Sequence, residues 1–225
     1  DWSSDVCSSD LYDYHVSRLP NDHLWITGKK NGKTFGMLPC GIPEDHELAI
    51  ELLDSVNYLK GLARPLAEDA RDRLIESGFS VVADRDNFDY LYLREDLATL
   101  KGRRFHKKRN HVNAFVNNYN YDETTLTPEN TNDAIRVNEM WRERRPDDKD
   151  DDYEASKEAL ELWQKLELKG YLVYVDGVPA AYTLGEALRR GRSFVVHFEK
   201  ALEDYRGLYQ FINKAFAYIQ IGRAS

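Results

Sequence analysis

Three strand-like stretches follow one another between residues 171 and 198, and amphipathic helical patterns stand on both sides of them. The stretches cover residues 171–175, 180–184 and 193–198, with an Asp176-Gly177 turn between the first two. Short β-rich runs separated by turn residues predict antiparallel strands that pair in chain order. Alternation with helices favours sheets flanked by helices over a bundle or a sandwich. We therefore predict an α/β or α+β fold with mixed sheets.

The first half of the chain shows the same alternation. Residues 24–41 predict a hairpin, because β-rich runs flank Asn31-Gly32, a pair that two-residue hairpin turns prefer. The other elements predicted in this half are a helix from Pro43 to near Gly61, a helix after Pro65 that ends before Gly78, and paired strands over residues 79–83 and 90–93.

The second half adds further helices around the predicted meander. The elements expected there are a long unbroken helix over 97–119, a strand over 119–126, and helices from Thr127, over 153–168 and over 205–219.

Both ends of the chain match translated sequencing adapter. Residues 1–11 are the conceptual translation of a common short-read adapter, and residues 221–225 are the translation of the adapter from the other side of an insert. We therefore expect both tails to be artificial and residues 12–220 to come from a gene truncated at both ends. The tails hold three aspartates and one arginine, so excluding them changes the formal net charge from −8 to −6.

Composition narrows the class of protein. Excluding the tails leaves Cys40 as the single cysteine, which argues against an internal disulfide and fits a reducing cytoplasm. No apolar run approaches the roughly 20 residues that a membrane-spanning helix needs. The acidic run at 147–152 predicts a solvated loop instead of a metal site, because its carboxylates lack the alternation and glycine of a calcium loop. We expect a cytoplasmic protein without a bound metal.

A cluster of basic residues stands out in this acidic chain. Its members are Lys101, Arg103, Arg104, Lys107, Lys108 and Arg109. Such a cluster indicates either a phosphate-bearing partner or a solvated helix face. In an unbroken helix, Arg104 and Lys108 lie one turn apart within the apolar stripe. These two residues are therefore predicted to bind an anion in a cleft, provided that the helix continues through Gly102.

A second cluster lies where the last predicted strand meets the last helix. Strand alternation places His197 and Glu199 on one face and Lys200 on the other. The following helix start directs backbone N–H groups at one point, which favours an anion or a developing oxyanion. Glu199 can serve as a general base, with Lys200 or Arg206 binding phosphate or carboxylate. The alternative is an ion pair at the strand end beside a helix-start arginine.

Two motifs carry a resemblance to a known family. The segments KGRRFHKKRNHVNAF at 101–115, HFEKA at 197–201 and YRGLYQFIN at 205–213 resemble the phosphatidylglycerol lysyltransferase C-terminal domain family, in particular its bacterial branch known as DUF2156. The resemblance implies tandem GNAT-like acyltransferase folds, similar to the Fem-type transferases, with halves at residues 12–94 and 95–220. It also implies an aminoacyl-tRNA donor and an amine or hydroxyl acceptor, either phosphatidylglycerol or a peptide.

The same resemblance implies roles for residues in these motifs. Glu199 or His197 would accept the proton of the nucleophile, and no cofactor is expected beyond the aminoacyl-tRNA substrate. The substrate-binding candidates are Arg104, Lys108, Arg109, Asn110, Lys200, Arg206, Gln210 and Asn213.

Two other functions remain open at this point. CoA-dependent enzymes of this fold carry a loop of the form Arg/Gln-x-x-Gly-x-Gly/Ala, whereas residues 203–209 hold one glycine followed by bulky residues. A CoA donor is therefore less favoured, but an acyl-CoA-dependent N-acyltransferase is the first alternative. The second is a non-catalytic RNA-binding module of the same fold, in which the basic cluster contacts phosphates.

Overall fold

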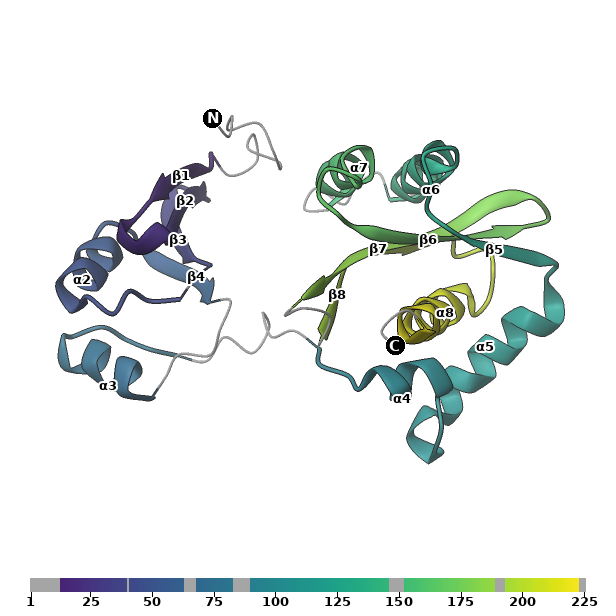
Figure 1. The fold of residues 1–225 in the computed structure, drawn as a ribbon, viewed down its shortest axis with the longest axis horizontal. Helices are drawn as coiled ribbons and strands as arrows, with labels where there is room; N and C mark the ends of the chain where they lie inside the picture. Colours follow the sequence, from purple (N-terminus) through teal and green to yellow (C-terminus); the bar gives the residue numbers. More distant parts are fainter. Residues whose placement is uncertain are drawn as a thin grey trace. The chain divides into compact units, whose positions relative to one another are not determined.

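The computed structural model describes six ranges of the chain, residues 13–39, 41–62, 68–82, 90–145, 152–188 and 193–222. The chain divides into two compact units, Asp1–Tyr90 and Leu91–Ser225. Each unit contains one four-stranded sheet with helices packed beside it (Figure 1). The predicted α+β class is therefore confirmed.

The first unit is built around a mixed sheet of order β1-β2-β3-β4. Its elements are β1 (His15–Arg18), a 3-10 turn (Pro20–Asp22), β2 (Leu24–Lys30), β3 (Lys33–Leu38), α2 (His46–Asp54), β4 (Tyr58–Leu62) and α3 (Glu68–Glu76). The predicted hairpin is confirmed, since β2 and β3 pair antiparallel across Asn31 and Gly32, both with positive φ. β4 then pairs parallel to β3, and Trp25, Leu38 and Leu52 form a small core.

Two predictions for this unit need correction. The helix predicted from Pro43 to near Gly61 is shorter, since it ends at Asp54 and residues 58–62 form β4. It begins at His46, because the Asp45 side chain caps it by accepting the backbone N–H groups of Glu47 and Leu48. The paired strands predicted over 79–83 and 90–93 are wrong for residues 79–82 and 90–93, which form no strand; Ala83 lies outside the described residues. The fourth strand is β4 instead, because it continues the sheet beside the buried strand β3.

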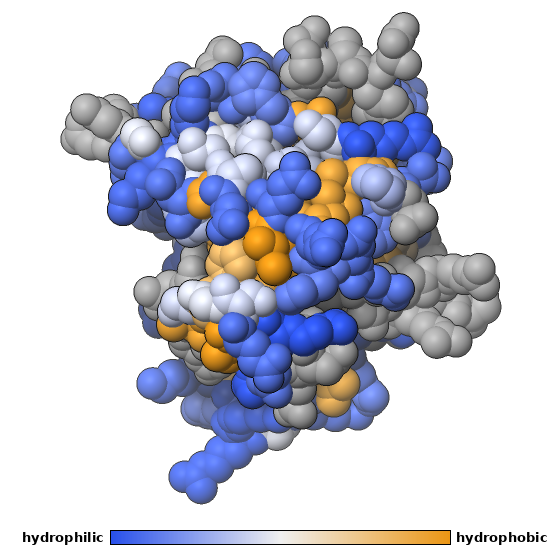
Figure 2. Space-filling view, turned by 90° about the vertical axis from the view of Figure 1, so that its left-hand side faces the viewer, coloured by the Kyte–Doolittle hydropathy of each residue, from blue (hydrophilic) through white to orange (hydrophobic). Residues whose placement is uncertain are grey.

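The surface in Figure 2 is mainly hydrophilic, with hydrophobic side chains gathered toward the middle of the face. The large hydrophobic side chains that stay exposed in the first unit include Val16, Leu24, Tyr58, Ile75 and Val82. Single exposed apolar side chains of this kind are common on folded proteins.

The second unit holds an antiparallel sheet of order β5-β6-β7-β8. Its strands are β5 (Tyr121–Thr125), β6 (Lys169–Val175), β7 (Val178–Leu188) and β8 (Ser193–Ala201). Its helices are α4 (Arg94–Thr99), the 3-10 turn η3 (Arg103–Phe105), α5 (His106–Asn118), α6 (Thr131–Glu143), α7 (Tyr153–Glu161) and α8 (Leu208–Gly222). The predicted three-strand meander is confirmed. From β5 onward, the elements follow one another as one strand, two helices, three strands and a helix.

The helices cover the two faces of this sheet separately. α6 and α7 lie on one face, and α4, α5 and α8 lie on the other (Figure 1). Each layer has its own core, one around Phe115, Ile212 and Phe216 and the other around Val137 and Leu160. Burial of both faces explains why β6 and β7 are almost continuously apolar.

The long helix predicted over 97–119 is wrong, because the chain breaks between α4 and α5. Leu100 and Gly102 both have positive φ, and α5 begins only at His106. Leu100 is 1% exposed, so the break turns its side chain into the core. The Arg109 guanidinium stabilises the turn by donating to the backbone carbonyls of Leu100 and Gly102.

Three other helices differ from the prediction at their ends. α6 begins at Thr131 because Asn130 organises the preceding loop, accepting the Thr127 N–H at 2.7 Å and donating to the Thr125 carbonyl at 3.0 Å. α7 ends at Glu161, and α8 begins at Leu208. The acidic run predicted as a solvated loop lies outside the described residues except for Asp152.

Candidate active site

The side chains of Glu199 and Lys200, at the end of β8, reach opposite faces of the sheet. Asn213 of α8 donates to a carboxylate oxygen of Glu199 at 3.5 Å. Lys200 instead donates to Asp152, and its Nζ lies 3.7 Å from the centroid of the Trp141 ring in α6. The alternation predicted for this pair is therefore confirmed, and the strand end presents a carboxylate to one helical layer and an ammonium group to the other.

The Glu199 carboxyl group lies in an environment that disfavours its charge. Burial raises its pKa to about 7, although the Asn213 amide, the Lys108 ammonium group and the Thr183 hydroxyl act in the opposite direction. Thr183 is the register partner of Glu199 on β7. A carboxyl group that titrates near neutral pH can accept a proton and later return it, as general acid–base catalysis requires.

Two hydroxyl-bearing residues lie beside Glu199, Thr183 as its register partner and Tyr209 as a donor to its backbone. The Thr183 oxygen is buried and makes no hydrogen bond of normal geometry within the described residues. The Tyr209 hydroxyl donates to the backbone carbonyl of Glu199 at 2.9 Å. Burial, followed by the nearby Glu199 carboxylate, raises the pKa of Tyr209, so its phenol stays protonated at neutral pH. The charge of Arg145 acts in the opposite direction on this pKa.

His197 occupies a different place from the one expected. The register of β7 with β8 shifts between Leu184 and Gly185, where Phe198 and Val196 are the successive partners, so His197 is the extra residue of a β-bulge. Its Nε2 lies 2.9 Å from a carboxylate oxygen of Glu186. No hydrogen bond joins it to Glu199 in the part of the chain that the structure describes. The bulge interrupts the simple alternation from which a shared face was predicted.

The basic cluster is divided by the break between α4 and α5. Lys108 acts electrostatically on Glu199 and lies 5.6 Å from the centroid of the Tyr92 ring. Arg104 is exposed on η3 and forms an ion pair with Asp96. Arg109 is bound to backbone carbonyls, as described above, and Asn110 is exposed on α5. The continuous stripe predicted to aim Arg104 and Lys108 together does not exist.

The start of α8 packs tightly against α5. Gly207 has φ +90°, and a β-carbon added there would lie 2.0 Å from the backbone carbonyl oxygen of His111. The Arg206 backbone N–H donates to the Tyr119 hydroxyl at 3.2 Å, while the Arg206 side chain is exposed. Gln210 follows, half-buried, in the first turn. The glycine of this loop therefore allows two helices to approach each other, a role that the sequence did not predict.

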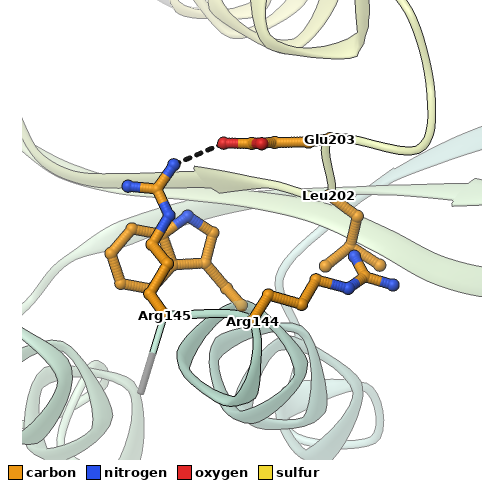
Figure 3. Close-up of a pocket in the computed structure, with 5 residues that line it drawn as sticks. Arg144, Arg145, Leu202 and Glu203 are labelled. Carbon is orange, nitrogen blue, oxygen red and sulfur yellow. Dashed lines mark hydrogen bonds and ion pairs between the residues drawn. The ribbon is translucent and has the colours of Figure 1, made fainter. Parts of the chain in front are cut away.

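A pocket of about 260 Å³ lies on the other side of the β8 end, lined by Trp141, Arg144, Arg145, Leu202 and Glu203 (Figure 3). Neither this pocket nor the positions of Thr183 and Tyr209 beside Glu199 were predicted from the sequence. Two sequence signals could have indicated them. One is the basic run at the end of α6, and the other is the spacing of Tyr209 and Asn213 by one helical turn.

Within its described ranges, the structure shows neither a metal-binding cluster nor a membrane-spanning helix. No group of three or more His, Cys, Asp or Glu side chains there is arranged to hold a metal ion. None of the helices in those ranges has both the length and the apolar character needed to cross a membrane.

Comparisons with known proteins place this geometry in a family. Residues 3–222 match the family described as phosphatidylglycerol lysyltransferase, C-terminal. A conserved protein of unknown function from Bacteroides thetaiotaomicron is similar, with 28% sequence identity and a TM-score of 0.74 over 94% of this chain and 74% of that one. No match was found among curated proteins.

Two more distant structures share the fold. The C-terminal DUF2156 domain of a putative lysylphosphatidylglycerol synthetase from Agrobacterium fabrum has 11% identity and a TM-score of 0.60, over 94% of this chain and 67% of that one. L-PGS from Bacillus licheniformis has 14% identity and a TM-score of 0.53, over 93% and 67%. With the family match across nearly its whole length, this chain belongs to the phosphatidylglycerol lysyltransferase C-terminal family.

Proposed function

We propose that this protein transfers an aminoacyl group from aminoacyl-tRNA to a hydroxyl or amine acceptor, with phosphatidylglycerol as the favoured acceptor. The observation that carries the proposal is Glu199, a carboxyl group with a pKa of about 7 at the end of β8. Membership of a family of lysyltransferases supports the reaction type. The cytoplasm is the compartment that we propose, because aminoacyl-tRNA is made there.

Glu199 acts as the general base in this proposal. Its carboxylate takes the proton of the acceptor hydroxyl while that oxygen attacks the aminoacyl carbonyl carbon. The ester bond to the terminal ribose then breaks, and Glu199 returns the proton to the departing ribose oxygen. The Asn213 amide, which already donates to the carboxylate at 3.5 Å, orients it for both transfers. No covalent enzyme intermediate is needed.

Phosphate binding is assigned to the cationic side of the site. Lys108 is close enough to Glu199 to lower its pKa, so it can also contact an anionic substrate at that point. Arg104 would exchange its exposed ion pair with Asp96 for an RNA phosphate, since exposed pairs of this kind contribute little stability. Arg206 and Gln210 would orient the donor at the start of α8, where N–H groups favour negative charge.

Two residues that were assigned to the site from the sequence have other partners in the structure. Arg109 holds the turn between α4 and α5, and His197 is bound to Glu186, so we give them positioning roles at most. A CoA donor is disfavoured because the backbone of Gly207 packs against the His111 carbonyl, so this glycine does not leave space for a pyrophosphate group. Turnover distinguishes the transferase from a non-catalytic RNA-binding module, whose salt-sensitive binding would survive Glu199→Gln.

The test is to incubate the protein with mixed aminoacyl-tRNAs and phosphatidylglycerol vesicles, following both ester loss from tRNA and aminoacyl-lipid formation. We expect both signals with the wild type and neither with Glu199→Gln. Parallel reactions replace the vesicles with a peptide amine, or the tRNA with acyl-CoA. Consumption of acyl-CoA without deacylation of any tRNA would overturn the proposal.

A further inference from the structure

The pocket beside the end of β8 combines two arginines with a buried indole. Trp141, Arg144 and Arg145 come from the end of α6, and Leu202 and Glu203 follow β8 (Figure 3). The pocket encloses about 260 Å³, enough room for one small charged group. Nothing in the catalytic role of Glu199 uses these residues.

Each arginine is held by a carboxylate of the loop after β8. Arg145 pairs with Glu203, as the dashed line in Figure 3 marks, and Arg144 pairs with Asp204 at 2.6 Å. The Glu203 side chain is 72% exposed and that of Asp204 is 59% exposed. Such solvent-exposed pairs are weak, so a better-placed anion can replace a carboxylate. Glu203 thus occupies the place that an anionic ligand would take.

The Trp141 indole supplies a second, independent sign of a ligand. Trp141 is 7% exposed, and its N–H is buried without an acceptor among the described residues. Buried donors nearly always have a partner in native proteins. A residue that lines the pocket therefore carries a donor without an acceptor, and a ligand oxygen would reach this donor when the Arg145 side chain, which lies over the Trp141 ring, shifts toward the ligand.

We propose that this pocket binds the phosphodiester monoanion of a glycerophospholipid headgroup. Its two non-bridging oxygens would accept from Arg145, Arg144 and the Trp141 indole N–H, replacing the Glu203 carboxylate. Paired guanidinium groups suit a phosphate because each offers two parallel donors. That the anion belongs to a lipid headgroup rests on the proposed function, in which phosphatidylglycerol is the acceptor. That the pocket binds an anion is inferred from its own residues.

β8 is the edge strand of its sheet, and the end of this strand separates the pocket from the Glu199 carboxylate. The Tyr209 hydroxyl donates to the Glu199 backbone carbonyl at 2.9 Å, so Tyr209 lies at this edge. For a headgroup bound at Arg145 to serve as the acceptor, its free hydroxyl would reach the Glu199 carboxylate around the β8 edge, past Tyr209.

A lipid headgroup fits this pocket better than RNA does. Single strands of RNA are held by bases stacked on aromatic rings and by several successive phosphates. Here the Trp141 ring already lies beside two cations, Lys200 at 3.7 Å and Arg145 at 4.5 Å from its centroid. The pocket thus provides one anion site without an open aromatic surface for a base.

The test measures binding of glycerophosphoglycerol, the headgroup without its acyl chains, by calorimetry and by the NMR signal of the Trp141 indole N–H. We expect binding that shifts this signal. Arg145→Gln should weaken the affinity at least tenfold, and Trp141→Phe severalfold. Arg136→Gln, an exposed arginine on the same helix, is the matched control and should leave the affinity unchanged.

Glu203→Gln makes the test independent of any loss of folding, because it should strengthen binding by removing the competing carboxylate. Weaker binding in that variant, or equal affinity in Arg145→Gln, overturns the proposal. So does binding of the dinucleotide CpA in place of glycerophosphoglycerol. If glycerophosphoglycerol binds as expected while no aminoacyl-tRNA is consumed, the anion site stands and the transferase function fails.

Discussion

Glu199 and Lys200 are consecutive residues of β8, yet Glu199 meets Asn213 of α8 and Lys200 meets Trp141 of α6 on the other face of the sheet. One strand end therefore supports the proposed general base in one layer and an arginine-lined pocket in the other. Tyr209 of α8 donates to the backbone carbonyl of Glu199 at 2.9 Å at the edge of this strand. This arrangement leads to five predictions.

Glu199→Gln should lower the rate of aminoacyl transfer about 10²- to 10⁴-fold, the usual contribution of a positioned general base. In the wild type, the rate should rise with pH and level off above about 7, because the pKa of Glu199 is raised to about 7 by burial. Single-turnover rates from pH 5.5 to 8.5 measure this profile. A flat profile together with an active Glu199→Gln enzyme would exclude Glu199 as the base.

The same raised pKa predicts that the ionised Glu199 destabilises the fold. The folded protein holds this proton more tightly than the unfolded chain, so stability should fall as pH rises from about 4.5 to about 7. The full shift corresponds to about 3 kcal/mol, reduced by solvent screening of this half-buried group. Denaturant unfolding should show Glu199→Gln gaining stability relative to the wild type between pH 5 and pH 8. If the difference in stability between the two proteins stays constant over this pH range, the Glu199 charge is not buried.

Lys108→Gln should move the pH–rate profile toward higher pH, because the ammonium group helps to keep Glu199 ionised. The rate at pH 7 should fall and then recover near pH 8.5. Lys107→Gln, at the exposed neighbouring position of α5, is the control and should leave the profile in place. Equal effects of the two substitutions on the profile would show that Lys108 contributes only general charge.

Gly207→Ala should reduce the free energy of unfolding by about 3 kcal/mol, combining left-handed backbone strain with overpacking. The added β-carbon would lie 2.0 Å from the His111 carbonyl oxygen, so α5 and α8 must separate. Gly177→Ala is the matched control, since Gly177 also has positive φ but has open space around it. Its smaller loss, about 1 kcal/mol, isolates the contact between the helices. If both substitutions reduce the free energy of unfolding equally, backbone strain alone explains the effect and the helix contact contributes nothing.

Asn138→Ala should destabilise the second unit by about 2–4 kcal/mol, because buried polar groups lose their partners. The Asn138 side-chain oxygen accepts from Ser156 at 2.9 Å and Tyr182 at 3.0 Å, and its amide donates to the Tyr153 carbonyl. Asn132→Ala, at an exposed position of α6, should cost little. Thermal unfolding of both variants checks this network, which joins α6 and α7 to β7.

Much of the fold was predictable because hydrophobic periodicity and turn chemistry act locally. The hairpin at Asn31-Gly32 and the meander of β6, β7 and β8 follow from residues close together in the chain. The break at Leu100 was not predictable, because a buried position for one leucine outweighs the helical pattern around it. Strand β4 was missed for a related reason, since it depends on pairing with β3.

The sequence by itself determined the alternation of strands and helices, the basic cluster and the adjacent Glu199-Lys200 pair. Only the tertiary structure decided which charges meet. It brought Lys108 and Asn213 to Glu199 from two helices, bound Arg109 to backbone carbonyls, and set Arg145 beside Trp141 and Glu203. The physical reason is that periodicity depends on neighbouring residues, whereas a pKa, an ion pair or a pocket depends on groups that packing brings together from distant parts of the chain.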